Sequence, residues 1–494
     1  MKKRLTALLL AAAMLSASLS GCSEKPAGAD DKEPAAENTP EIAAPAETEP
    51  ETELTDGLPD TDMQGFELNI LHHSQEWLAW AYNVLEAEEL TGETLNDAIF
   101  ARTEALEQRF NAKIVTDPIN QVNPDQISQL AVSGDSSYDL CMMYDLRITG
   151  AIQYLADMQD LPYISLDAAW WNPYASSIFK IGGTQYAASG NFSLSVLSRA
   201  GGYIFNKSMA EQLNLTSPYE YVKNGSWTVD NMMKMADAAN QDINGDGQTT
   251  NDDQFGIESS VKEHFLRMIF GSGVALITQD ADGLPVFDLP TDETAVTKMQ
   301  HILDVSMGGG WYRTKSDNVD ATDAMMSGTF KNGRALFVTG NPNSLTGMRE
   351  YDFDFGFVPV PKFDEQQDRY YAPSFGAELS VLPVSYDTSS SEYIGMLLEA
   401  MAFYTQQNIV PEYIETLVKS KLSRDAESAE MFAVAFDSIY FDFGINAWQE
   451  QVAAKLLKGS FVDLKGNFGS VLQTMKKSVD AEIKRLLKQI DKGN

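Results

Sequence analysis

Three oxygen-bearing side chains in the middle of the chain have the spacing of ligands in a calcium-binding loop. They stand at positions 1, 3 and 5 of the run Asp242-Ile-Asn244-Gly-Asp246-Gly-Gln248, in which Gln248 would offer its backbone carbonyl at position 7, and Asp253 occupies position 12. Carboxylate and amide oxygens suit a hard divalent cation, and glycine at position 6 permits the sharp turn that brings them together. The spacing therefore predicts a structural Ca2+ ion held by these five residues.

A polar turn without metal is the alternative for the same stretch. Asn-Gly and Asp-Gly pairs form turns in their own right, and aspartate at position 12 is shorter than the usual glutamate. Of the two interpretations, we favour the calcium site over the metal-free turn. No reacting group is implied nearby, so the ion would stabilise structure and no catalytic cofactor is expected.

Catalytic motifs are absent from the sequence. None of the four histidines (His72, His73, His264 and His301) stands in a metal-ligand pattern, and no nucleophile elbow, phosphate loop or dinucleotide fingerprint occurs. The many carboxylates leave room for a glycosidase pair, although their spacing marks none. We therefore predict that the protein is not an enzyme.

Aromatic and polar residues gather next to turns and strand ends. Sugars bind by stacking their C–H faces on aromatic rings and by hydrogen bonds to polar side chains, and binding residues concentrate on loops at the carboxyl ends of parallel strands. For Trp170 and Trp171, packing in the core is about as favoured as a place in the cleft. For Asp145, the alternative to ligand binding is a cap of the next helix. The predicted ligand-binding residues are Trp77, Trp80, Asp145, Arg147, Trp170, Trp171, Asn191, Asn341 and Asn343.

Alternating strand and helix patterns place these residues on an α/β scaffold. Strands are predicted at 66–71, 112–115 and 139–144, with helices at 97–110 and 125–132 between them. This βαβαβ order predicts a parallel sheet covered by helices. Later patterns predict strands at 353–358 and 378–382, a helix at 392–404 opened by a Ser389–Glu392 capping box, and a long amphipathic C-terminal helix.

The N-terminus combines three basic residues, an apolar run from Leu5 to Leu19 and Cys22, which is typical of a secretory signal. Ser20-Gly21-Cys22 resembles the bacterial lipobox, and this resemblance implies a signal peptide over 1–21 and a lipid-carrying Cys22. An ordinary signal with an incidental cysteine is the alternative. Residues 23–62 hold 13 acidic residues and no aromatic ring, which predicts a disordered acidic tether.

The formal net charge of −35 disfavours nucleic acid and anionic lipid surfaces as partners, and leaves uncharged ligands open. No second apolar stretch is long enough to span a bilayer. Cys141, the other cysteine, is predicted to be a buried hydrophobe, so no intrachain disulfide remains.

The body resembles the family 1 extracellular solute-binding proteins, which are carbohydrate-binding lipoproteins of bacterial ABC importers. The resemblance rests on the order of several stretches, namely Tyr138–Arg147, Phe179–Tyr186, Tyr203–Lys207, Phe330–Phe337 and Gly356–Lys362. It implies a type II periplasmic-binding-protein fold with a ligand cleft between two hinged lobes. The implied lobes are 63–200 plus 354–405, and 203–353 plus 406–494.

The resemblance also implies a function. We expect a monomer, lipid-anchored on the extracellular face of a Gram-positive-type surface, that captures a sugar or oligosaccharide by lobe closure and delivers it to an ABC permease. A surface-anchored glycoside hydrolase and a binder of peptide or another solute on the same fold are the rival interpretations.

Overall fold

The first sheet joins parts of the chain that lie far apart in the sequence. Its strand order is β14-β3-β1-β2, with β1 parallel to β2 and β3, and β14 antiparallel to β3. The predicted βαβαβ start and its parallel sheet are confirmed. The bounds are Phe66–His73 for β1, Ala112–Ile119 for β2, Leu140–Tyr144 for β3 and Glu378–Val381 for β14.

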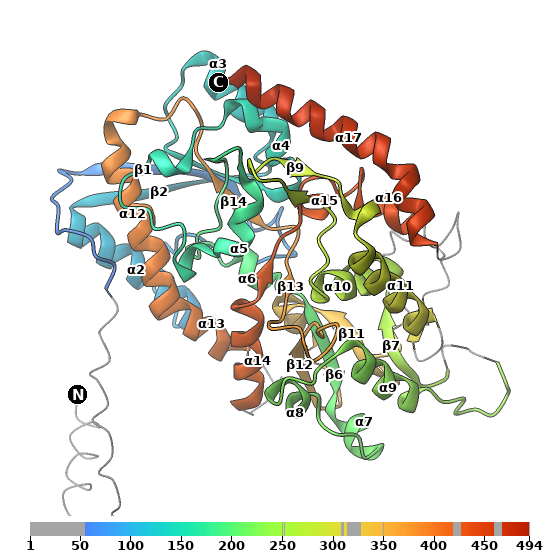
Figure 1. Ribbon diagram of the computed structural model, residues 1–494. Coiled ribbons are helices and arrows are strands. Elements are labelled where there is room, and N and C mark those ends of the chain that lie inside the picture. Colours follow the sequence, from blue (N-terminus) through green and yellow to red (C-terminus); the bar gives the residue numbers. More distant parts are fainter. Residues whose placement is uncertain are drawn as a thin grey trace, which may run out of the picture. The chain divides into compact units, whose positions relative to one another are not determined.

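Helices α2 (Thr94–Phe110) and α12 (Ser391–Tyr404) pack against each other and against this sheet (Figure 1). Leu95, Ile99 and Leu106 of α2 are buried at helical spacing, so one face of the helix covers the strands. Helix α3 (Pro124–Ser133) links β2 to β3 and begins with a capping box in which Asn123 and Gln126 exchange hydrogen bonds.

The predicted capping box of α12 is wrong. A 3₁₀ turn, Thr388–Ser390, precedes the helix, and Asp387 caps that turn instead. The Asp387 carboxylate accepts hydrogen bonds from the Ser389 amide at 3.0 Å and from the hydroxyls of Ser389 and Ser390. The Asp387 carboxylate binds three donors at the start of the 3₁₀ turn, which is more than one serine hydroxyl can bind. Ser389 therefore does not act as the cap.

The second sheet has five strands in the order β10-β7-β11-β6-β12. Strands β10 and β11 run parallel to β7, whereas β6 is antiparallel to both β11 and β12. All residues of β6, β7, β11 and β12 are buried, as expected for a sheet covered on both faces. The bounds are Gly202–Asn206 for β6, Phe255–Ser259 for β7, Trp311–Arg313 for β10, Ala335–Gly340 for β11 and Phe355–Pro359 for β12.

Strand β12 lies in the second sheet, so the prediction that the chain returns to the first lobe at residue 354 is wrong for this strand. Phe355 to Pro359 pair with β6 throughout their length. Phe357 also stacks on Phe432 of α14 (Ala426–Phe436), with ring centroids 4.8 Å apart. The chain rejoins the first sheet only at β14. The apolar strand pattern was right, but it carries no information about which sheet the strand joins.

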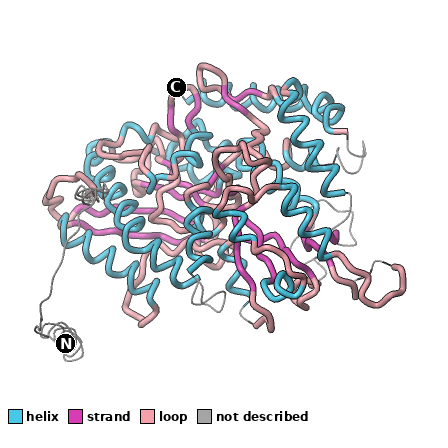
Figure 2. Tube along the Cα trace, turned by 60° about the horizontal axis from the view of Figure 1, so that its bottom comes forward, coloured by secondary structure: helices cyan, strands magenta, loops and turns pink. Residues whose placement is uncertain are grey.

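Helices flank the second sheet, and several segments link the two sheets (Figure 2). Helix α12 continues through a π turn at Thr405–Ile409 into α13 (Val410–Leu417). The C-terminal helix α17 (Phe468–Gly493) packs on α11 and α16 and also on residues 152–154, which belong to the β3 side of the molecule. The remaining helices are α7 (Lys207–Gln212), α8 (Pro218–Lys223), α9 (Val229–Ala239), α10 (Val261–Gly271), α11 (Glu293–Met307), α15 (Phe443–Asn446) and α16 (Ala453–Lys458).

Short elements complete the chain. They are α4 (Ile148–Ala151), α5 (Pro173–Ser176), α6 (Ser195–Ser198), and the two-stranded pairs β4 (Lys180–Ile181) with β5 (Thr184–Gln185), β8 (Thr278–Gln279) with β9 (Pro285–Val286), and β13 (Ala372–Pro373) with β15 (Ile439–Tyr440). Cys141 in β3 is fully buried, as predicted.

This computed structural model describes residues 55–248, 250, 252–307, 311–313, 328–348, 350–417, 426–458 and 467–493. The predicted signal peptide, Cys22 and most of the acidic tether lie outside these residues. Within them, no helix is both long and apolar enough to cross a bilayer.

Gly395 in α12 provides a test of the helix packing. A β-carbon at Gly395 would lie 1.9 Å from the carbonyl oxygen of Pro162, which is backbone and has no rotamer to change. We predict that Gly395→Ala lowers the free energy of unfolding by about 1–2 kcal/mol, because overpacking outweighs the ~1 kcal/mol gain in helix propensity. Urea denaturation measures this effect.

Gly469 in α17 is the matched control, since a β-carbon there meets only the Asn467 side chain, at 3.8 Å. Gly469→Ala is expected to leave stability unchanged or slightly raised. Equal effects of the two substitutions would contradict the packing of α12 on Pro162.

Candidate functional site

A cleft of about 370 Å3 lies between the ends of the two sheets. Trp80, which follows β1, and Arg199, which precedes β6, line it from one side. The residues from the second sheet and its loops are Glu258, Gly328, Phe330, Lys331, Val338, Thr339, Asn341, Asn343, Ser344, Gly347, Met348 and Tyr351. We call this hollow the intersheet cleft.

Aromatic rings form the first-sheet wall beside the cleft. Trp77, Trp80 and Tyr144 contact one another edge to face, with centroid distances of 5.3, 5.8 and 6.1 Å. Trp80 is 38 % exposed, which is high for tryptophan in a folded protein. Its ring nitrogen donates to the Gly376 carbonyl at 2.9 Å, so the indole is held in place while much of its surface stays accessible.

A buried carboxylate holds this aromatic wall. Glu378, the first residue of β14, accepts from the backbone amide of His73 at 2.8 Å and lies 2.7 Å from Nδ1 of the same residue. Its second oxygen accepts from Asn83 at 3.2 Å. The His73 ring in turn stacks on Trp77, with centroids 4.4 Å apart. Glu378 therefore fixes the orientation of Trp77 through His73.

Asn341 and Asn343 lie on the opposite wall, just past the end of β11. The Asn341 side chain is buried and accepts from the amide of Ser344 at 3.1 Å, which opens a 3₁₀ turn, Pro342–Met348. Asn343 is half-buried and lines the cleft. Of the predicted ligand residues, the structure thus gathers Trp80, Asn341 and Asn343 around one cleft, with Trp77 against Trp80.

Asp145 lies beneath this region and is fully buried. One carboxylate oxygen accepts from the Gly376 amide at 3.0 Å and from Asn446 at 2.9 Å, and the other accepts from the Leu146 amide at 2.8 Å. Burial raises the pKa of Asp145 to about 6, although these hydrogen bonds oppose the shift. The carboxylate joins β3 to the segment before β14 and to α15, which is a structural arrangement.

The other predicted ligand residues lie in different places. Arg147 lines a hollow of about 320 Å3 with Trp448 and Arg485. Trp170 and Trp171 both donate to the Glu399 carboxylate, at 2.9 and 2.7 Å, and Trp171 is fully buried.

Asn191 lines a separate hollow of about 410 Å3 beside Tyr174 and Asp437. It donates to the Gln406 side chain at 2.5 Å. Five of the nine predicted residues are therefore divided among three hollows, and which of these a ligand occupies stays a prediction.

Sequence reasoning did not select four residues that belong to the cleft and its wall, namely Tyr144, Arg199, Met348 and Tyr351. Tyr144 ends β3 one residue before Asp145, so its place at a strand end was a usable signal. Arg199 donates to the Phe375 carbonyl at 3.1 Å. Arg199 lies at the cleft because the chain crosses from one sheet to the other next to it. The local sequence does not reveal where that crossing occurs.

The predicted calcium loop connects α9 to β7. Asp242 accepts from the amides of Gly245 and Gly247 at 2.7 and 2.8 Å, which lowers its pKa, and the two glycines have φ of +72°. A bridge between Gln241 and Gln254 closes the neck of the loop. Residues 242–248 therefore form a turn, and the bridge brings the two ends of the loop together.

Asn244 and Asp246 also accept backbone hydrogen bonds within the loop, and Gln248 is exposed on it. Asp253, at position 12, is only 3 % exposed, and its Oδ1 has no hydrogen-bond partner among the described residues. A carboxylate oxygen without a partner is able to accept a hard cation. Within the described residues, however, no cluster of three or more His, Cys, Asp or Glu side chains is arranged to hold a metal.

Comparison with solved structures identifies the fold. The chain is similar to a cyclo/maltodextrin-binding protein complexed with maltotetraose, with a TM-score of 0.54 and 14 % identity over 87 % of this chain and 98 % of that one. A cyclic α-maltosyl-1,6-maltose binding protein from Arthrobacter globiformis matches with a TM-score of 0.50 and 14 % identity, over 85 % and 100 % of the chains. M. tuberculosis UspC matches with a TM-score of 0.54 and 12 % identity, over 84 % and 100 %.

No model of a protein family matches the chain, and no curated protein sequence does. At these identities the likeness establishes the fold, which is the two-lobe α/β fold of maltose-binding-type solute-binding proteins. The predicted fold class is confirmed.

The Glu378 contacts can be tested by mutation. We predict that Glu378→Ala lowers the free energy of unfolding by about 3 kcal/mol, because it leaves buried donors of His73 and Asn83 without an acceptor. Near-UV circular dichroism should change as Trp77 loses its support. Glu378→Gln keeps one acceptor oxygen and should cost less. An unchanged aromatic spectrum in the alanine variant would contradict the role of Glu378 in orienting Trp77.

Proposed function

We propose that the protein is a solute-binding protein that captures a sugar or oligosaccharide in the intersheet cleft and does not act as an enzyme. The observation that carries the proposal is the partly exposed Trp80 beside Trp77 and Tyr144, facing Asn341 and Asn343 across the cleft. An aromatic platform opposite amide groups suits a neutral polyhydroxylated ligand. The maltodextrin and cyclic maltosyl-maltose binding proteins with this fold support the sugar class.

Binding would couple to movement of the lobes. Because one wall of the cleft comes from the first sheet and the other from the second, a ligand contacts both walls only when they are close together. Such a ligand binds the closed arrangement more tightly than the open one and therefore stabilises the closed arrangement. The closed form would then be the one recognised by the permease of an ABC importer, which completes the transport function in this proposal.

The N-terminal signal extends this proposal to the cell surface. A lipid on Cys22 would hold the protein at the outer face of the membrane, and the acidic residues 23–54 would act as a tether between lipid and body, because Asp56 and Asp60 already pair with Arg109 of the body. A tether of this length spans roughly 30 Å as a flexible coil. A monomer held in this way stays close to its permease and is free to reorient.

Trp80 provides the test of the ligand site. A screen of malto-oligosaccharides, other sugars and peptides by thermal shift and calorimetry should find a sugar that binds without being hydrolysed. Trp80→Ala should weaken that binding by about tenfold or more, since loss of a stacking ring costs at least 1–2 kcal/mol, and Trp80→Phe should weaken it less.

Tyr174, which is 55 % exposed in the Asn191 hollow, is the matched control. Tyr174→Ala should leave sugar affinity unchanged. If Tyr174→Ala abolishes binding and Trp80→Ala does not, the ligand occupies the other hollow. Release of shortened sugars by the purified protein would instead support a glycoside hydrolase.

We further propose that Asp242, Asn244, Asp246, Gln248 and Asp253 hold a structural Ca2+ ion. Added calcium should then raise the melting temperature and EDTA should lower it, because a ligand that binds only the folded state adds about 2.7 kcal/mol at 100 times its dissociation constant. Asp242→Asn should abolish the response. Asp252→Asn removes a charge from the same exposed loop at a position outside the five ligands, and should keep it. If calcium and EDTA change the melting temperature of both variants equally, the loop is a turn that does not bind the ion.

A further inference from the structure

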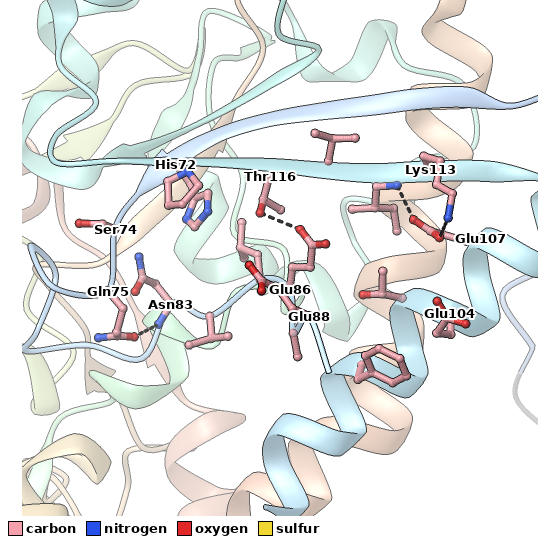
Figure 3. A pocket seen from close by; sticks show the side chains of 18 residues that line it. His72, Ser74, Gln75, Asn83, Glu86, Glu88, Glu104, Glu107, Lys113 and Thr116 are labelled. Atoms are coloured by element: carbon pink, nitrogen blue, oxygen red, sulfur yellow. Dashed lines mark hydrogen bonds and ion pairs between the residues drawn. The ribbon is translucent and has the colours of Figure 1, made fainter. Parts of the chain in front are cut away.

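The first lobe contains a second, larger hollow, of about 790 Å3, between the end of β1, residues 83–88, helix α2 and strand β2 (Figure 3). We call it the Glu86 pocket. None of the residues that line it also lines the intersheet cleft. The proposed capture of sugar therefore does not use this pocket.

Four carboxylates give the Glu86 pocket a negative interior and rim. Glu86 and Glu107 are half-buried, whereas Glu88 and Glu104 are exposed at the rim. Lys113, which pairs with Glu107, is the one lysine or arginine among the described lining residues. Arg102 lies behind the wall, where it donates to the Leu85 carbonyl. Even when both cations are counted, the carboxylates are in excess.

The rim carboxylates are available to a ligand. Glu86 accepts from the Thr116 hydroxyl at 2.8 Å, and Glu107 accepts from the Ile114 amide at 3.0 Å. The side chains of Glu88 and Glu104 make no hydrogen bond within the described part of the chain, although Glu107 and, to a smaller extent, the Glu104 carboxylate raise the pKa of Lys113. The Glu88 and Glu104 carboxylates and the overall negative charge of the protein together attract a positively charged ligand.

Buried polar atoms in the same pocket point independently to a ligand. His72, Asn83 and Thr103 are 6 %, 0 % and 7 % exposed, and all three line the pocket. His72 Nδ1, Asn83 Oδ1 and Thr103 Oγ1 are buried without a hydrogen-bond partner among the described residues. Burial also lowers the pKa of His72, so its ring is neutral at pH 7. Buried polar atoms are normally paired, so three unpaired atoms in residues that line one pocket mark a place where a polar partner is missing.

The chemistry of the two groups is complementary. The amide oxygen of Asn83 and the hydroxyl oxygen of Thr103 accept hydrogen bonds, and the carboxylates of Glu88 and Glu104 accept them with charge assistance. Such a set fits a group that carries several N–H donors and a positive charge. Apolar side chains, among them Phe100 and Val115, also line the pocket and suit a hydrocarbon chain.

We propose that the Glu86 pocket binds a small organic cation through a guanidinium or primary ammonium group. The cation can be a free molecule or a side chain of a short basic peptide, because both present the same group. The pocket shares no lining residue with the sugar cleft, so its test is carried out without sugar, and failure of one proposal leaves the other standing.

The test is calorimetric titration at low salt with three probes. Agmatine represents a free cation and N-acetyl-arginine amide a peptide side chain, while N-acetyl-citrulline amide is the neutral isostere of the latter. We expect the arginine derivative to bind and the citrulline derivative not to bind. Preference for agmatine over the arginine derivative would assign a free cation, and the reverse a peptide. Absence of binding by both cations at 10 mM, or equal binding of arginine and citrulline derivatives, would overturn the proposal.

Matched variants separate the pocket from the overall charge. Glu88→Gln with Glu104→Gln should weaken binding about five- to tenfold, as expected for two partly exposed ion pairs. The control, Glu76→Gln with Glu89→Gln, removes the same charge from exposed neighbours outside the pocket and should leave affinity unchanged. Thr103→Val should also weaken binding, without a change of charge. Equal losses in the two double variants would show that only the diffuse field attracts the cation.

Discussion

The need to satisfy two buried carboxylates at one end of the first sheet determines how the cleft is built. Glu378 and Asp145 are at most 1 % exposed, and a buried carboxylate is tolerated only when hydrogen bonds surround it. Glu378 meets this need through His73 and Asn83, and Asp145 through Gly376, Leu146 and Asn446. These contacts tie β1, β3 and β14 together at the edge where the aromatic wall lies.

The same contacts reach beyond the first sheet. Asn446 donates both to Asp145 and to the Ser374 carbonyl, at 2.9 and 2.8 Å, so α15 is joined to the segment that leads into β14. Gly376 supplies its amide to Asp145 and its carbonyl to Trp80. The position of the exposed indole therefore depends on a carboxylate that no ligand can reach. Loss of that carboxylate would disturb the cleft without removing any ligand contact.

The sequence predicted much of this fold, because periodicity and order depend on local residues. The βαβαβ start, the strand at β14 and the C-terminal helix were all recognisable from apolar spacing. The sheet that receives β12 was not, since a fully buried apolar strand fits either sheet equally well. The capping box predicted for α12 was also wrong, because Asp387, two residues before Ser389, caps a 3₁₀ turn that precedes the helix.

The candidate site was less predictable than the fold, for a physical reason. Tryptophan next to a turn looks the same in sequence whether its ring covers a cleft, as with Trp80, or donates to a buried carboxylate, as with Trp171 and Glu399. The difference lies in the partner, and Glu399 is more than two hundred residues away in the chain. Asp145 is likewise a residue type that often contacts ligands. Its actual partners, Gly376 and Asn446, are far away in the sequence and reach it only in the folded protein.

Adjacent histidines at the end of β1 explain why two different hollows adjoin one strand. Successive side chains of a strand point to opposite faces, so His73 packs on Trp77 beside the cleft while His72 lines the Glu86 pocket. Asn83 lies where the two environments meet. Its amide nitrogen donates to Glu378 and to the His73 carbonyl, and its oxygen is buried without a partner among the described residues. Because one planar amide serves both sides, a group that binds the oxygen also restrains the nitrogen that helps hold Glu378.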